Sequence, residues 1–243
     1  MTPNFNSSYL DQAGTTCYWH GRVDTPENYK KNLKEKPDLM AKNGWDDTPS
    51  ISYTFNSHGF RCDEFTTDPT IMFLGCSLTY GTALPIDVGW AKLVASKLGL
   101  KSANLGQEGS SADTAFRLCL GWIDRIQPKI VVYLKPPRIR WELIYKDTSL
   151  NLGTHSRMPG WVLNSYIEHY VLNDNNDFFN DQKNTMGIEN ICRSRNIPVY
   201  IYDADNDLLA LQTSDDRARD CLHPGVLTNH KFAQRVIEDI QNG

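Results

Sequence analysis

The chain has 243 residues, of which 40% are hydrophobic and 22% are charged, and its formal net charge is −4 at pH 7. This length predicts one large domain, or one domain with a sizeable extension, and this composition excludes a wholly disordered chain. The acidic balance argues against nucleic acid as a partner, because binding to a phosphate backbone requires clustered Lys and Arg.

No secretory signal and no membrane span are expected. The first twenty residues lack a basic start and an apolar run, and the longest apolar runs in the chain are short. We therefore expect a protein that is made in the cytoplasm and has no membrane partner. The six cysteines are widely spaced and form no Cys-x-x-Cys pair, which predicts reduced thiols and no metal site.

The first 69 residues differ from the rest of the chain. They are rich in Asn, Thr, Lys and Asp and contain scattered aromatic side chains, with a short helix predicted near residues 27–34. Aromatic side chains stabilise a folded protein mainly when they are buried. We therefore expect residues 1–69 to be an extension that packs on a core domain formed by residues 70–243.

From residue 70, short apolar strands alternate with segments of helical periodicity. Residues 163–195 are expected to be largely helical, with an Asn- and Asp-rich interruption at 173–177. Such alternation predicts a parallel sheet with helices on both faces, which is a three-layer α/β/α sandwich. The other predicted strands and helices lie at 70–74, 90–98, 102–105, 112–126, 130–134, 197–202 and 233–240.

Ligands of parallel sheets bind beyond the carboxyl ends of the strands, so the residues that follow each strand are candidates for the site. Ser77 follows the first strand, a turn at residues 106–109 follows the second, and Asp220 and His223 lie near the C-terminus. A serine hydroxyl attacks an ester only when a base takes its proton, and histidine oriented by a carboxylate is such a base. Each residue alone has a commoner structural role, but together they predict acyl transfer through a serine.

Three motifs, in this order, resemble the SGNH/GDSL hydrolase family over about residues 70–240. They are IMFLGCSLTYG at residues 71–81, NLGQEGSS at 104–111 and DCLH at 220–223. The resemblance implies a flavodoxin-like sandwich and carboxylic ester substrates, including acetyl groups on sugars. It implies Ser77 as nucleophile, His223 as base, Asp220 as its partner, and an oxyanion hole from the amides of Ser77 and Gly109. This chemistry requires no cofactor and no metal.

The first motif departs from the family pattern, because Cys76 stands where an aspartate is usual. Variants with Gly-Cys-Ser in this place are similar to proteins of marine bacteria and their phages. Cys76 is therefore an alternative nucleophile, since a thiolate at such a turn is reactive. The commoner role for a small cysteine at this position is that of a buried packing residue.

The segment after the strand at 130–134 also departs from the pattern, because it lacks the asparagine that donates a third hydrogen bond to the oxyanion. Loss of one such donor costs about 10²–10³ in rate. Arg138 or Arg140 can replace that donor or bind an anionic substrate. The structural alternative is that both arginines lie at the surface and pair with Glu142 or Asp147.

The sequence thus predicts a serine esterase or deacylase of small-molecule or carbohydrate esters. One alternative is a catalytically silent binding or structural module, for example in a virion, with its partner bound through the N-terminal extension. A further alternative is an acyltransferase, which differs from a hydrolase in whether water reaches the site.

Overall fold

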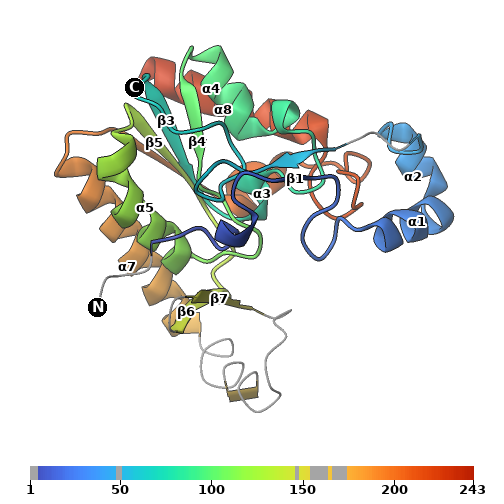
Figure 1. The fold of residues 1–243 in the computed structure, drawn as a ribbon, viewed down its shortest axis with the longest axis horizontal. Helices are drawn as coiled ribbons and strands as arrows, with labels where there is room; N and C mark the ends of the chain where they lie inside the picture. Colours follow the sequence, from blue (N-terminus) through green and yellow to red (C-terminus); the bar gives the residue numbers. More distant parts are fainter. Residues whose placement is uncertain (1–4, 48–50, 146–147, 154–163, 166–173) are drawn as a thin grey trace.

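The computed structural model describes residues 5–47, 51–145, 148–153, 164–165 and 174–243. Four parallel strands form the central sheet in the order β4-β3-β5-β8, and helices cover both faces (Figure 1). The fold is therefore the predicted α/β/α sandwich. The strands are β3 (Thr70–Leu74), β4 (Lys101–Asn104), β5 (Ile130–Lys135) and β8 (Val199–Asp203).

Two hydrophobic clusters fill the spaces between the sheet and its helices. On one face, Val131 and Tyr133 of β5 pack with α5 and α7. On the other face, Val132 and Leu134 pack with α4 and α8. Successive strand residues thus point into opposite layers, which explains why the central strands are continuous apolar runs. The four helices are α4 (Trp90–Lys97), α5 (Ala112–Ile126), α7 (Asp174–Arg193) and α8 (Val226–Asn242).

The start of α5 shows how the sequence defines a helix next to the site. The Ser111 hydroxyl accepts a hydrogen bond from the amide of Thr114, and the Thr114 side chain bonds back to the amide of Ser111. This capping box satisfies amides that a helix end otherwise leaves unpaired. It fixes the point at which the turn after β4 becomes helix.

The N-terminal residues form a small antiparallel ribbon, which lies near α3 in Figure 1, and two helices, which lie at one end of the molecule. Buried aromatic side chains from this part, such as Tyr53 and Phe55, share a third hydrophobic cluster with Tyr80 and Ala83, which follow β3. The N-terminal residues thus pack beside the turn that carries Ser77. The elements are η1 (Leu10–Gln12), β1 (Thr16–Cys17), α1 (Pro26–Glu35), α2 (Pro37–Lys42) and β2 (Tyr53–Thr54).

The segment between β5 and β8 differs from the sequence predictions in two ways. A hairpin of β6 (Trp141–Tyr145) and β7 (Thr148–Leu152) follows β5 and was not predicted. Helix α7 starts at Asp174 and is continuous, so the predicted interruption is wrong for residues 174–177. Tertiary contacts of Asp177, Asn180 and Asn184 outweigh the turn preference of Asn and Asp here. The earlier part of that predicted helix, 163 and 166–173, lies outside the described residues.

Candidate active site

The turn after β3 places Ser77 at the edge of the sheet, as the first residue of α3 (Ser77–Tyr80). Gly75 in this turn has a φ of 152°. A Cβ atom on Gly75 would lie 2.2 Å from Thr79 Oγ1 and 2.8 Å from the carbonyl oxygen of Leu134. Only glycine fits in this conformation and this space, so Gly75 allows the chain to turn directly from strand to helix.

A second turn, formed by residues 220–223, holds the predicted acid and the predicted base. One oxygen of the Asp220 carboxylate accepts hydrogen bonds from the amides of Leu222 and His223, at 2.9 and 3.0 Å. Its other oxygen lies 2.5 Å from Nδ1 of His223. Cys221 between them adopts a φ of 58°, which closes the turn tightly. The carboxylate therefore both shapes the turn and orients the imidazole ring.

The two turns meet at Ser77. Nε2 of His223 lies 2.9 Å from Oγ of Ser77, so Asp220, His223 and Ser77 form a continuous hydrogen-bonded chain. This is the arrangement in which a histidine can take a proton from a serine hydroxyl. Cys76, the alternative nucleophile, is 1% exposed, and the imidazole bonds to the neighbouring Ser77 instead.

The charges around His223 favour its protonated form. Burial lowers the pKa of His223, but the hydrogen bond and charge of Asp220 outweigh this effect and raise it above its usual value. Glu108 raises the pKa further, while the positive charge of Arg140 opposes the rise. For Asp220 itself, burial raises the pKa, but the hydrogen bond and charge of His223 outweigh that effect and keep it below its usual range. The site thus stabilises an imidazolium beside a carboxylate.

Two backbone amides near Ser77 are free to bind an oxyanion. Among the described residues, neither the amide of Ser77 nor that of Gly109 donates a hydrogen bond. Gly109 adopts a φ of 68°, which favours glycine, and the space around its Cα is open. An amide at a helix start and an amide of an open glycine turn are the donors that an oxyanion hole requires.

The Gly109 turn is tied to the serine turn by the side chains of Asn104 and Ser110. Asn104 donates from Nδ2 to the carbonyl of Thr79 at 2.7 Å and accepts from the amide of Gly106 at 3.0 Å. The Ser110 hydroxyl donates to the carbonyl of Gly75 at 2.9 Å. These contacts fix the position of the Gly109 turn relative to Ser77.

Glu108 is a second carboxylate near the site that the sequence reading missed. It accepts a hydrogen bond from the Thr82 hydroxyl at 2.8 Å and lies 3.3 Å from Nδ1 of His20. His20 is buried among aromatic rings, and the Tyr80 hydroxyl is 3.0 Å from the same nitrogen. A lone histidine has no sequence signal for such a role.

The N-terminal residues also support the turn that carries Asp220. Asn32 donates from Nδ2 to the carbonyl of Asp220 at 3.0 Å. Arg219 bonds to the carboxylate of Asp24 at 2.9 and 2.7 Å, and both side chains are only 1% exposed. The Tyr53 hydroxyl donates to the same carboxylate. The turn that carries His223 is therefore supported by residues that precede it by nearly the whole chain.

The two arginines after β5 differ in their surroundings. Arg138 is exposed. Arg140 is partly buried, and its Nη1 atom has no hydrogen-bond partner among the described residues. Glu142 does not pair with either of them, because Arg117 binds its carboxylate at 2.7 and 2.8 Å. Asp147, the other expected partner, lies outside the described residues.

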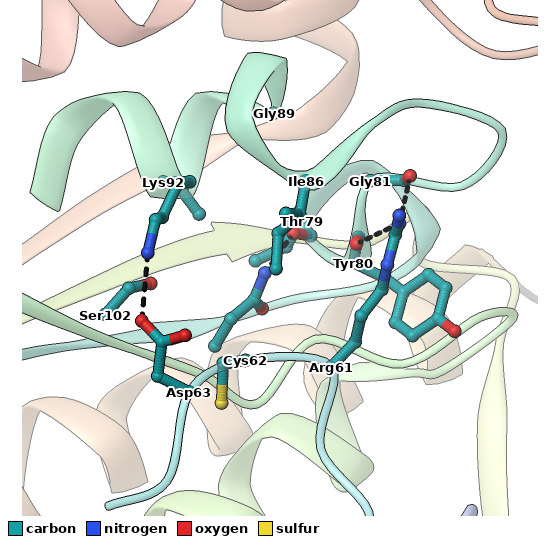
Figure 2. Close-up of a pocket in the computed structure, with 12 residues that line it drawn as sticks. Arg61, Cys62, Asp63, Thr79, Tyr80, Gly81, Ile86, Gly89, Lys92 and Ser102 are labelled. Carbon is teal, nitrogen blue, oxygen red and sulfur yellow. Dashed lines mark hydrogen bonds and ion pairs between the residues drawn. The ribbon is translucent and has the colours of Figure 1, made fainter. Parts of the chain in front are cut away.

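A small pocket with a volume of about 190 Å³ borders the serine and histidine. A separate pocket of about 340 Å³ includes neither of them in its lining, and there Arg61 donates to carbonyl groups and Lys92 pairs with Asp63 (Figure 2). The site pocket is lined by Ser77, Leu78, Gly81, Thr82, Leu84, Leu208, His223, Pro224 and Asn229.

Within the described ranges, no three His, Cys, Asp or Glu side chains lie close enough together to hold a metal ion. A search of the same ranges finds no helix with the length and apolar character that crossing a membrane requires.

No family model and no curated protein matches the chain. Solved structures that are similar in fold include an esterase, a lipolytic protein and a lipase/acylhydrolase. The psychrotrophic esterase EstA from a Pseudoalteromonas species has 16% identity and a TM-score of 0.39, over 72% of this chain and 98% of that chain. A G-D-S-L family lipolytic protein from Desulfitobacterium hafniense has 14% identity and a TM-score of 0.37, over 70% of this chain and 98% of that chain. A lipase/acylhydrolase from Enterococcus faecalis has 13% identity and a TM-score of 0.33, over 72% of this chain and 96% of that chain.

Proposed function

We propose that the protein is a serine ester hydrolase. The observation that carries this proposal is the distance of 2.9 Å between Nε2 of His223 and Oγ of Ser77, with Asp220 bound to the far side of the imidazole ring. A serine within hydrogen-bond reach of an oriented histidine is the arrangement that activates a hydroxyl for attack on an ester.

In the first half of the reaction, Ser77 Oγ forms a bond to the ester carbonyl carbon while its proton moves to Nε2 of His223. The carbonyl oxygen becomes an oxyanion and accepts hydrogen bonds from the amides of Ser77 and Gly109. His223 then gives its proton to the leaving alcohol oxygen as the carbon–oxygen bond breaks. The product of this half is an acyl group on Ser77 and a free alcohol.

In the second half, His223 takes a proton from a water molecule as that water attacks the acyl carbon. The bond to Ser77 breaks, the serine oxygen recovers the proton from His223, and the carboxylic acid leaves. Asp220 remains ionised throughout, since its pKa is held below its usual range by His223. Its negative charge stabilises the imidazolium that forms in both halves.

The pocket beside Ser77 favours a short acyl group. Its empty space amounts to about 190 Å³, part of which is open to solvent, so there is room for only a small group beside the serine. Three leucine side chains, Leu78, Leu84 and Leu208, make part of its wall apolar. We therefore propose acetyl or similarly short esters as substrates, with acetylated carbohydrates as one class.

The test is labelling with a fluorophosphonate, followed by measurement of the intact mass. We expect one adduct on the wild-type protein and on Cys76→Ala, and no adduct on Ser77→Ala or His223→Ala. An absence of adduct on the folded wild-type protein would overturn the proposal and favour a silent binding module. Adduct formation on Ser77→Ala that is lost in Cys76→Ala would make the cysteine the nucleophile.

A further inference from the structure

Arg140 is a charged side chain near the site that the esterase mechanism does not use. It ends the connection that leaves the carboxyl end of β5, the neighbour of β3 in the sheet. Its side-chain stem lies against the end of the β6–β7 hairpin, since a Cβ atom on Gly153 would be 3.5 Å from Cγ of Arg140. Contact at this point limits where the guanidinium group can lie.

The guanidinium of Arg140 lacks an acceptor that comparable arginines have. Arg117 and Arg219 are also largely buried, and each binds a carboxylate through two nitrogens. Nη1 of Arg140 is buried without any acceptor in the described part of the chain, and no carboxylate there pairs with Arg140. A buried donor without an acceptor is unfavourable, so an acceptor supplied from outside the protein would bind there with a gain in free energy.

The positive charge of Arg140 acts on His223. It opposes the rise in the pKa of the imidazole that Asp220 and Glu108 produce. In the free protein, Arg140 therefore works against the imidazolium that must form during catalysis. An anion bound to Arg140 would cancel this effect and make His223 a stronger base at the moment when substrate is present.

The position of Arg140 indicates which part of an ester would meet it. The small pocket beside Ser77 is lined by Leu208, which follows β8, and by Asn229 of α8. The β6–β7 hairpin lies beside α7, away from α8, in Figure 1. An ester whose acyl group fills the small pocket would therefore extend its alcohol part toward the hairpin side.

We propose that Arg140 binds an anionic group, a carboxylate or a phosphate, on the alcohol part of the ester substrate. This proposal rests on the proposed esterase function and narrows its substrate class to esters of negatively charged alcohols. The planar guanidinium fits both groups through paired hydrogen bonds, which a lysine does not reproduce.

Matched acetyl esters test this assignment. 4-Acetoxybenzoate and 4-acetoxyphenyl phosphate carry the two anions, and 4-acetoxybenzamide is a neutral ester of similar size. For Arg140→Gln we expect kcat/KM to fall about ten- to a hundredfold for the preferred anionic ester, mainly through KM, and by about twofold or less for the amide. Arg140→Lys is expected to lie between wild type and Arg140→Gln. The ester with the larger loss identifies the anion.

Two further arginine variants complete the design. Arg193→Gln removes an exposed charge on α7 and is the matched control, for which we expect wild-type values with every ester. Arg138→Gln tests the exposed neighbour; a selective loss there instead of in Arg140→Gln would overturn the assignment. Calorimetry gives a readout without turnover, because 4-hydroxybenzoate or 4-hydroxyphenyl phosphate should bind wild type more tightly than Arg140→Gln.

The outcomes separate this inference from the proposed function. If fluorophosphonate labels the wild-type protein but Arg140→Gln changes no substrate selectively, the inference fails and the esterase stands. Equal losses on charged and neutral esters would overturn the inference and make Arg140 a donor to the oxyanion. If the wild-type protein is not labelled at all, the proposed function itself fails.

Discussion

The turn that holds Asp220 and the connection that holds Arg140 both act on His223, yet they are built differently. Both oxygens of the Asp220 carboxylate have partners, and the backbone carbonyl of Asp220 accepts a bond from Asn32. Arg140 has a buried nitrogen with no partner among the described residues. The first region is complete without substrate, as a fixed catalytic geometry requires, whereas the second leaves an interaction for a ligand to complete.

The largest expected effect comes from removing the negative charge of Asp220. Asp220→Asn preserves size but weakens the orientation of His223 and the stabilisation of its cation, so kcat should fall about 10⁴-fold. Hydrolysis of 4-nitrophenyl acetate measures this fall. Asp205→Asn, at an exposed position, is the control and should keep the wild-type rate. A rate within about tenfold of wild type for Asp220→Asn would contradict the assigned role.

The second-largest expected effect is on stability, and it comes from breaking the buried ion pair between Asp24 and Arg219. Asp24→Ala leaves the Arg219 guanidinium buried without its carboxylate, which should lower the free energy of unfolding by about 3–5 kcal/mol. Urea denaturation measures the change. The matched control is Lys42→Ala, because Lys42 and Asp215 join the same two segments through an exposed pair. We expect the midpoint of Lys42→Ala to equal that of wild type, and similar midpoints for both variants would contradict the importance of the buried pair.

A smaller effect should appear in the pH dependence of kcat/KM. His223 acts as a base only when it is neutral, and its pKa is raised, so activity should fall as the pH decreases through a value above the usual histidine pKa of about 6.5. Arg140→Gln removes a charge that opposes protonation and should move this limb to still higher pH. A limb that stays in place in Arg140→Gln would show that Arg140 does not act on His223.

The smallest expected effect on activity comes from changing Cys76, the buried residue that precedes Ser77. Cys76→Ala should leave kcat/KM for 4-nitrophenyl acetate within about threefold of wild type, because Ser77 and not Cys76 bonds to His223. Cys76→Ser is the size-matched companion variant. A loss of activity in both variants, with the fold intact by circular dichroism, would contradict this assignment.

The parts of the fold that the sequence predicted are those whose pattern follows from burial. β3 lies at its predicted residues, 70–74, because both faces of a central strand are covered and every side chain is apolar or buried. Helix α5 likewise covers residues 112–126, the range that its apolar stripe predicts. The β6–β7 hairpin was missed because the alternation of apolar and polar side chains extends over only three residues in one strand, 141–143, and four in the other, 149–152.

In the candidate site, too, some residues lie in a recognisable local sequence pattern and others do not. Ser77, Asp220 and His223, which the structure brings together, could be proposed from the sequence because each lies in a short motif whose spacing has a chemical meaning. Glu108, His20 and Asp24 could not, since their partners are distant in the chain and no local spacing relates them. Single charged or aromatic residues in a polar extension are typical of a solvated surface, so only the three-dimensional contacts assign them to the site.

The contact between Asp24 and Arg219 joins residues that are 195 positions apart. A contact of this kind closes only after almost the whole chain is available, so it belongs to the late stages of folding. The central strands can pair before that time, but the turn that carries the base lacks its support until the first residues dock. We therefore expect pulse-labelled hydrogen exchange to show protection of β3 and β5 before protection of residues 216–224, so that the chain becomes folded before it becomes active.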